Sequence, residues 1–487
     1  MFHGPATSVA QLALCSALLA ALVGPASATE APHPCHVRGV EHEVKCGSVT
    51  RPLDPATPEG VKIEVRYVVV SARARNKLPD PIFLLAGGPG QSAISVVSAM
   101  QPLFGRLANR RDVVYVDQRG TGTSAPLLCD EDPRRSLTEE ADSAREIQEM
   151  MRCRKQLQKL PYGDLRFFTT SIAMQDLDAV RRELGADRIN LVGESYGTRA
   201  GLEYMRAFPQ AVRRAVLDGV APPDLGLTGS IATDAERSLS ALIAACESDL
   251  ICRADHPDLK RAWAAFLASL PRQGSAGNPL TGQVETFTLT RELVENAIRG
   301  PLYSPALAAG LPAAMDAAMK GRYEPLLGLS SLMSFRGVTR LAYGMHFSVV
   351  CSEDVRGEKS VDGAGDNDMA ERYRKICAEW PRHEVSPEYY RVPVASAPTL
   401  LLSGGIDPVL PPRHAERVAK QLGPKALSVV VPNAGHNVLA IGCMHEVLFE
   451  FIDAIDDDAA LHVKTGCAKD VPRPPAFRPV ALPSVKP

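Results

Sequence analysis

The five residues 193–197, Gly-Glu-Ser-Tyr-Gly, constrain this sequence more than any other feature. They follow an apolar run at 189–192 that predicts a buried strand, and they precede a helix-forming segment at 198–205. The two glycines allow a tight turn that passes close to neighbouring backbone. A strand, such a turn and a helix form the context in which a serine hydroxyl is exposed as a nucleophile. The sequence therefore predicts that Ser195 is catalytic, with a plain Gly/Ser turn as the alternative.

A serine hydroxyl needs a base and an orienting acid to become a nucleophile. The run 398–403 predicts a buried strand that ends in a loop carrying Asp407, and 427–431 predicts a second that ends in a loop carrying His436. The order Ser, Asp, His along the chain is that of α/β-hydrolases. Asp218, at the end of an intervening predicted strand, is the rival acid. We favour Asp407 because its loop has the open Gly-Gly-x-Asp-Pro form and precedes His436.

Backbone amides must hold the negative charge that develops on the substrate oxygen during attack. The apolar run 81–85 predicts a strand that leads into Ala-Gly-Gly-Pro-Gly-Gln-Ser at 86–92, where glycines leave amides uncovered. We expect Gly88, with Gly87 as a possible assistant, to supply one donor and the amide of Tyr196 the other. A phosphate-binding loop is the alternative for such glycines, but no Gly-Lys-Ser/Thr follows.

Several short motifs occur together in this chain. They are Gly-Gly-Pro-Gly-x-Ser at 87–92, Asp-Gln-Arg-Gly-x-Gly-x-Ser at 117–124, the Gly-Glu-Ser-Tyr-Gly turn, and a late Gly-x-x-Asp-Pro followed by Gly-His. Together they resemble α/β-hydrolases of the proline iminopeptidase and tripeptidyl aminopeptidase group. Residues 46–54 and 351–380 resemble its secreted branch with a TAP-like C-terminal region, and Ala86, in place of a histidine usual in cytosolic relatives, favours the same branch.

This resemblance implies an α/β-hydrolase fold, a mostly parallel sheet with flanking helices and an inserted helical cap domain. Arg119, in the second motif, is expected to hold a structural turn rather than to act in catalysis. Segment 274–279 predicts a loop inside the cap. The expected regions are a signal peptide at 1–28, the first part of the core at 29–221, the cap at 222–395, the second part of the core at 396–470 and a Pro-rich tail at 471–487.

Composition and the amino-terminal segment bear on location and partners. Hydrophobic residues make up 45% of the 487 residues and the net charge is −2, so there is no electrostatic case for nucleic acid. An apolar stretch at 9–23, too short to span a bilayer comfortably, precedes Ala-Ser-Ala and predicts signal peptide cleavage near Ala28. We expect a periplasmic or secreted protein with a peptide or small-molecule substrate, no stable membrane insertion and no cofactor. The oligomeric state stays open.

Cleavage of the signal peptide removes Cys15 and leaves ten cysteines, an even number for an oxidising compartment. Metal binding is the weaker alternative, and we expect no metal site, since the sequence has no Cys-x-x-Cys pair and no His-Glu-x-x-His. Sequence alone does not fix connectivity. The simplest scheme pairs neighbours along the chain: Cys35–Cys46, Cys129–Cys153, Cys246–Cys252, Cys351–Cys377 and Cys443–Cys467.

An enzyme that trims the amino terminus of a peptide must bind a free ammonium group, which a carboxylate in the cap does by a charge-assisted hydrogen bond. Glu353 and Asp354, beside Cys351, are the candidates, with a solvated surface acid as the alternative for each. Glu194 is expected to face away from substrate. The sequence thus predicts a secreted serine hydrolase, an aminopeptidase that releases tripeptides, dipeptides or single residues through an acyl-enzyme. The alternatives are an esterase acting on small esters and a catalytically inactive binding protein on a hydrolase fold.

Overall fold

Short apolar runs bounded by Gly, Pro and Asp form the central layer of the molecule. A computed structural model describes residues 30–333, 340–355 and 368–479, apart from 131, 133 and 141, together with residues 1 and 4. Among these residues, nine strands form one sheet in the order β1-β2-β3-β5-β4-β6-β7-β10-β11. Every residue of β4, β5 and β10 is buried, as expected for strands covered on both faces.

The sheet changes from antiparallel to parallel pairing at β5. Strands β1, β2, β3 and β5 pair antiparallel, whereas β5, β4, β6, β7, β10 and β11 run parallel to one another. Parallel strands bring their carboxyl ends to one edge of the sheet, which is where ligands bind in open α/β folds. The bounds are β1 Glu30–Cys35, β2 Val44–Pro52, β3 Lys62–Val70, β4 Ile82–Leu85, β5 Val113–Val116, β6 Ile189–Glu194, β7 Val212–Asp218, β10 Thr399–Gly404 and β11 Ala426–Val431.

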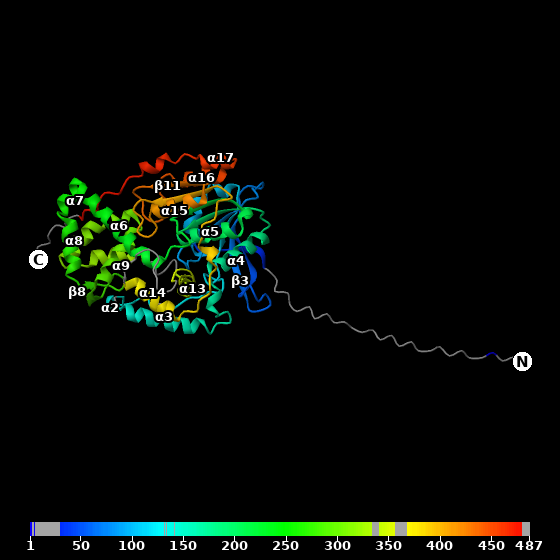
Figure 1. Cartoon of the computed structure of the whole chain (residues 1–487), viewed down its shortest axis with the longest axis horizontal. Coiled ribbons are helices and arrows are strands. Elements are labelled where there is room, and N and C mark those ends of the chain that lie inside the picture. The colour runs from blue at the N-terminus through cyan, green and yellow to red at the C-terminus, as the bar shows by residue number, and fades with distance from the viewer. Residues whose placement is uncertain are drawn as a thin grey trace.

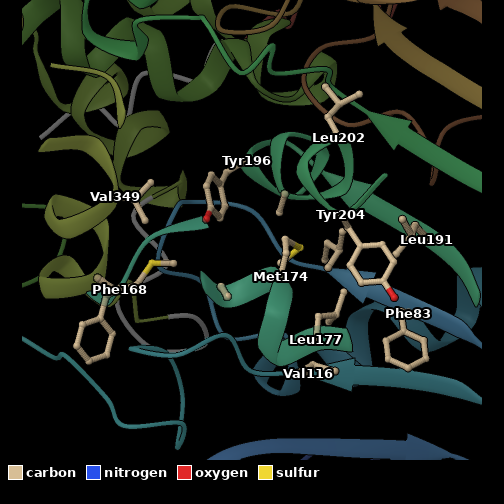
Figure 2. Packing of buried hydrophobic residues seen from close by; sticks show 14 of the residues in the cluster. Phe83, Val116, Phe168, Met174, Leu177, Leu191, Tyr196, Leu202, Tyr204 and Val349 are labelled. Atoms are coloured by element: carbon tan, nitrogen blue, oxygen red, sulfur yellow. The ribbon is translucent and has the colours of Figure 1, made fainter. Parts of the chain in front are cut away.

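Alternate residues of the parallel strands divide between two hydrophobic clusters, one on each face of the sheet. Phe83 belongs to the first cluster, and its neighbour Leu84 belongs to the second. Figure 2 shows Phe83 beside Tyr204 of helix α5, and Leu177 of α4 in the same cluster. Helix α5 begins directly after Ser195, so its packing on the sheet fixes the position of the predicted nucleophile.

The flanking helices have apolar faces that match these clusters. In α15, Ala415, Val418 and Leu422 recur three or four residues apart and are buried in the first cluster. Helix α16 packs on the opposite face of the sheet through Val447 and Phe451. The bounds are α1 Val97–Met100, α2 Leu137–Glu140, α3 Ser143–Leu157, α4 Thr170–Glu183, α5 Tyr196–Ala207, α15 Pro412–Leu422, α16 Met444–Asp453 and α17 Asp457–Leu461.

The segment between β7 and β10 carries the additional helices that the sequence predicted as a cap. Figure 1 shows α6, α8, α9 and β8 grouped at one end of the molecule, with the sheet and α4, α5 and α16 at the other. This group has its own apolar cluster, which includes Trp263, Phe287 and Met315. The bounds are α6 Leu227–Ser248, α7 Leu250–Asp255, α8 Leu259–Ala268, α9 Arg291–Leu302, α10 Pro305–Ala308, α11 Leu311–Met319 and α12 Glu324–Met333.

Two further helices of this segment, α13 (Tyr343–Glu353) and α14 (Asp368–Glu379), pack differently. Val349 of α13 and Ile376 of α14 lie in the first cluster of the sheet, not in the separate cluster of the cap. Helix α13 therefore brings residues of the predicted cap into direct contact with the core. The predicted domain bounds themselves stay a prediction.

One local prediction within the cap is wrong. Residues predicted as a loop at 274–279 form, up to Gly277, the strand β8 (Arg272–Gly277), which pairs antiparallel with β9 (Val284–Leu289). In β9, Phe287 and Leu289 are buried while the residue between them is exposed, which is the two-residue period of a half-buried strand. Of the predicted loop, only residues 278 and 279 lie in the turn between the two strands. The inserted segment therefore contains a β-hairpin as well as helices.

All five disulfides of the structure are those predicted from chain order. Their Cα atoms are 5.0 to 6.4 Å apart, within the range usual for disulfides. Such a number of bridges is consistent with a protein of an oxidising, extracytoplasmic compartment. Among the helices described, none is long and apolar enough to cross a membrane. Except for Met1 and Gly4, the predicted signal peptide lies outside the described residues.

The described part of the Pro-rich tail, residues 471–479, is extended and bonded to the rest of the protein. Asn433 Nδ2 donates to the carbonyl of Val471 at 2.9 Å, and the Phe477 amide donates to the carbonyl of Ala309 at 2.9 Å. Figure 1 shows this red segment running from the side of α17 to the side of α7. The tail thus connects the sheet to the helices of the cap, and residues 480–487 lie outside the described part.

Candidate active site

Ser195 occupies a strained turn between β6 and α5. Its φ of 55° and ψ of −122° place it in a region that residues with a side chain seldom adopt. The flanking glycines are required: a Cβ at Gly197 would lie 2.0 Å from the carbonyl oxygen of Leu85. The Ser195 amide donates to Asp218 O at 2.9 Å, and Thr198 Oγ1 donates to Ser195 O at 2.6 Å. These contacts brace the turn predicted from the Gly-Glu-Ser-Tyr-Gly motif.

Asp407 and His436 come together at the carboxyl ends of the neighbouring strands β10 and β11. His436 Nδ1 lies 2.7 Å from Asp407 Oδ2. The other oxygen of Asp407 accepts the amides of Val409 at 2.8 Å and Leu410 at 2.9 Å, which fixes the orientation of the carboxylate. Burial alone would lower the pKa of His436, but the adjacent Asp407 raises it above its ordinary value. The two side chains that the sequence predicted to act together are thus in contact, and their catalytic role stays a prediction.

Asp218, the rival acid, has a different place. Its carboxylate accepts the amide of Val438 at 2.7 Å and that of Leu439 at 2.9 Å, so it holds the chain just after His436. Burial raises the pKa of Asp218 to about 7. The structure therefore pairs the His436 ring with Asp407 and assigns Asp218 to the support of the histidine loop.

The glycine loop after β4 lies against the nucleophile. A Cβ at Gly87 would lie 3.3 Å from Ser195 Cβ. The Gly87 amide donates to Gln91 Oε1 at 3.1 Å and is therefore engaged, while Gly88 has a φ of 110° that favours glycine. Tyr196 is the first residue of α5, where an amide has no acceptor within the helix. This placement fits Gly88 and Tyr196 as oxyanion donors, which stays a prediction.

Arg119 is fully buried, and its contacts are structural. Its guanidinium forms an ion pair with Asp176 at 2.6 Å and donates to the carbonyl of Leu53 at 2.7 Å. It thereby connects the turn after β5 to helix α4 and to the chain after β2. This agrees with the expectation that the Asp-Gln-Arg-Gly segment is a turn near the site.

Glu353 and Asp354, predicted to receive a substrate ammonium group, are both engaged with protein groups in this structure. Glu353 is 1% exposed, and its carboxylate accepts the Thr170 amide at 2.7 Å, Thr170 Oγ1 at 2.9 Å and the Tyr389 hydroxyl. Asp354 Oδ1 forms a buried ion pair with Arg199 at 2.6 Å. Both carboxylates thus contact protein groups, Thr170 and Tyr389 for Glu353 and Arg199 for Asp354, where the expectation places a substrate ammonium group. Their role in substrate binding stays a prediction.

The contacts of Glu353 lead to the nucleophile turn instead. Thr170 Oγ1 also lies 2.7 Å from the hydroxyl of Tyr196, the residue after Ser195. Figure 2 shows Tyr196 in the first cluster of the sheet, near Val349 of α13 and Met174 of α4 in this view. A chain of hydrogen bonds thus runs from the end of α13 through α4 to the start of α5.

Residues of the inserted segment reach the catalytic loops, and sequence reasoning missed them. The Tyr303 ring lies 5.0 Å from the His436 ring, edge to face, and Tyr303 O accepts the His436 amide at 2.9 Å. Opposite, the Ala342 amide donates to Gly90 O at 2.9 Å, and His346 Nδ1 lies 3.1 Å from Pro89 O. Tyr303 directly follows the amphipathic helix α9, and no sequence motif marks it.

Comparison with known families agrees with this architecture. Residues 80–248 match the family described as alpha/beta hydrolase fold, and residues 363–456 match the family described as TAP-like protein. The chain therefore has the α/β-hydrolase fold. Its C-terminal part matches a TAP-like segment, as the resemblance of its motifs implied.

Individual relatives resemble a limited part of the chain. Tripeptidyl aminopeptidase of Streptomyces coelicolor is 31% identical over 193 residues, which cover 37% of this chain and 36% of that protein. Serine protease Hip1 of Mycobacterium bovis is 32% identical over 196 residues, which cover 37% and 36%. Probable proline iminopeptidase of Streptomyces coelicolor is 29% identical over 198 residues, covering 41% and 44%. The match thus spans about a third of the length of the first two relatives.

Proposed function

We propose that the chain is a serine hydrolase that acts as an aminopeptidase and releases tripeptides, dipeptides or single residues. One observation carries the proposal: the strained turn at Ser195 lies at the same edge of the sheet as Asp407 and His436, whose side chains are 2.7 Å apart. The relatives named as tripeptidyl aminopeptidase and proline iminopeptidase support the choice of an amino-terminal peptide as substrate. The five disulfides support a periplasmic or secreted location.

The proposed mechanism follows from the geometry of His436. Its bond to Asp407 keeps a proton on Nδ1, so Nε2 is the nitrogen that acts as base. Nε2 takes the proton of Ser195 Oγ while that oxygen bonds to the substrate carbonyl carbon, and the amides of Gly88 and Tyr196 hold the oxyanion. His436 then gives its proton to the leaving amine as the carbon–nitrogen bond breaks.

Deacylation uses the same groups with water as nucleophile. His436 Nε2 takes a proton from water, the hydroxide oxygen bonds to the acyl carbon, and the ester bond to Ser195 breaks as the proton returns to Oγ. The buried ion pair of Asp407 with the protonated ring stabilises each charged step, because both side chains are removed from bulk water.

A fluorophosphonate probe tests the hydrolase part of this proposal. Wild-type protein should become covalently labelled, and Ser195→Ala should not. A panel of aminoacyl, dipeptidyl and tripeptidyl chromogenic amides, each with a free and an acetylated amino group, then tests the aminopeptidase part. Cleavage of free and acetylated substrates at equal rates would exclude an aminopeptidase, and absence of labelling would favour the inactive binding protein.

An esterase acting on small esters is the second candidate, and one observation favours it. Both acids predicted to hold an ammonium group have protein partners, Thr170 and Tyr389 for Glu353 and Arg199 for Asp354. A small acetate ester requires no such acid. Turnover of acetate esters without turnover of any free-amino peptide amide would establish the esterase.

A further inference from the structure

A cavity separate from the catalytic residues lies where three parts of the chain meet. Its volume is about 340 Å³, within the range of small-molecule sites. Its walls come from the cap helices α6, α7, α10 and α11, from Ile406 beside the proposed catalytic acid, and from residues 473–476 of the tail. Ser195, Asp407 and His436 are not among the lining residues, so the cavity is distinct from the site where acyl transfer is proposed.

Most of the wall is apolar and fixed in place. Leu242, Ala308 and Ile406 contribute buried apolar side chains. The tail wall is held on the side after the cavity by the Phe477 amide, which donates to the carbonyl of Ala309 at 2.9 Å, and by an ion pair of the next residue with the end of α7. The cavity is therefore bounded by anchored segments rather than by a free chain end.

One positively charged side chain in this wall, that of Arg473, has no ion-pair partner among the described residues. The guanidinium of Arg473 forms no hydrogen bond and no ion pair with any residue that the structure describes, and its Nε is buried. Burial lowers the pKa of Arg473, because its charge lacks a compensating anion. Asp249 also lines the cavity, but its Oδ1 accepts the amides of Ile251 at 3.0 Å and Cys252 at 2.8 Å and so caps α7.

We propose that this cavity binds a small molecule with an apolar body and a carboxylate, with the carboxylate on Arg473. A guanidinium presents paired donors that match a carboxylate, and the pair is strongest where water is partly excluded. The apolar walls take the rest of the ligand through the hydrophobic effect. Two sources share this chemistry: a free aliphatic acid, and the carboxyl-terminal residues of an apolar peptide.

Octanoate and octanol are the probes that separate the two contributions, because they share a chain length and differ in charge. We expect octanoate to bind wild-type protein in calorimetric titrations. Arg473→Gln should weaken the binding of octanoate by about 10- to 150-fold, which is the effect of losing a charge-assisted hydrogen bond. Octanol should bind the two proteins alike. Arg478→Gln is the matched control, since Arg478 lies in the same tail, pairs with Asp255 and does not line the cavity.

A second variant tests the location of binding independently of charge. Ala245 lines the cavity from α6, and Ala245→Phe should fill the cavity and abolish octanoate binding while Arg473 remains. Thermal unfolding of each variant checks that the protein is folded. The proposal would be overturned if Ala245→Phe bound octanoate as well as wild type, or if Arg473→Gln and Arg478→Gln weakened octanoate binding equally. It would also be overturned if octanol bound as tightly as octanoate, or if octanoate did not bind at all.

The source of the ligand is resolved by a peptide arm in the Ser195→Ala background, which prevents turnover. N-acetyl-leucyl-leucine is compared there with its carboxyl-terminal amide. Binding of the free acid but not of the amide, with loss in Arg473→Gln, identifies a peptide carboxyl terminus as a ligand. Binding of octanoate alone identifies a free aliphatic acid, and either result supports the proposed carboxylate site.

Discussion

Replacement of Glu353 by Gln tests the structural role that the hydrogen bonds of this residue indicate. The carboxylate accepts two bonds from Thr170 and one from Tyr389, all inside the protein. Burial raises the pKa of Glu353 from its ordinary 4.5 to about 7, although the nearby Arg199 opposes the rise. A glutamine has the same shape and no titration, so the comparison isolates the charge.

The sign of the effect follows from linkage. A carboxyl group with a higher pKa in the folded state binds its proton more tightly when folded, so the stability that it adds is present below pH 4.5. This stability is lost as the pH rises through 7. The shift in the pKa of Glu353 corresponds to about 3 kcal/mol in the free energy of unfolding. Near pH 5, Glu353→Gln should be less stable than wild type by about 1 kcal/mol, because the amide group cannot accept all the hydrogen bonds that the carboxyl group accepts. Near pH 8 it should be the more stable protein.

Urea unfolding of both proteins at pH 5, 6.5 and 8 measures this difference directly. Asp218 titrates in both proteins, so its effect cancels in the comparison. Glu384→Gln, at an exposed position, serves as a control that should show no such crossing. If wild type instead gained stability over Glu353→Gln as the pH rose, the carboxylate would be ionised and stabilised by Arg199, and the reasoning from burial would be refuted.

The remaining predictions concern catalysis and the disulfides. Ser195→Ala and His436→Ala should each lower kcat by about four to six orders of magnitude without loss of fold, measured on the best substrate of the panel. Asp407→Asn should lower kcat strongly with unchanged unfolding, whereas Asp218→Asn should mainly reduce stability; the reverse pattern would contradict the assignment of the acid. Because the pKa of His436 is raised above its ordinary 6.5, kcat/KM should fall with decreasing pH already above 6.5, and a fall that begins only below 6.5 would disagree. Thiol titration of native mature protein should find no free cysteine, and several free thiols would refute the pairing.

Local sequence patterns predicted the elements that carry the residues proposed as catalytic. The apolar runs at 81–85, 189–192 and 398–403 became buried parallel strands, and the run at 427–431 became the partly exposed edge strand β11. Parallel strands bring the residues that follow them to one edge of the sheet. For this reason the positions of Ser195, Asp407 and His436 at strand ends were enough to predict that Asp407 and His436 meet. The disulfides follow the simplest of the pairings that the sequence left open, in which each cysteine pairs with its neighbour along the chain.

Contacts between distant segments were not predictable from local patterns. Glu353 is an acid beside a cysteine in the sequence, and nothing there indicates that Thr170 on α4 takes both of its oxygens. The contact of Tyr303 with His436 depends in the same way on how α9 ends over the sheet. The β8 strand was missed because glycines at 274 and 277 favour a loop by propensity, while pairing with β9 overrides that preference.

The distribution of the disulfides has a mechanical consequence. Each bridge closes a loop of 6 to 26 residues, and none joins the α6–α12 region to the sheet. At His436, the contact between these two regions consists of non-covalent bonds, such as that from the His436 amide to Tyr303 O. Oxidation therefore restrains the chain within each part and adds no covalent link between the α6–α12 region and the sheet. If the two parts were to separate, Tyr303 would lose its contacts with His436 in the same movement.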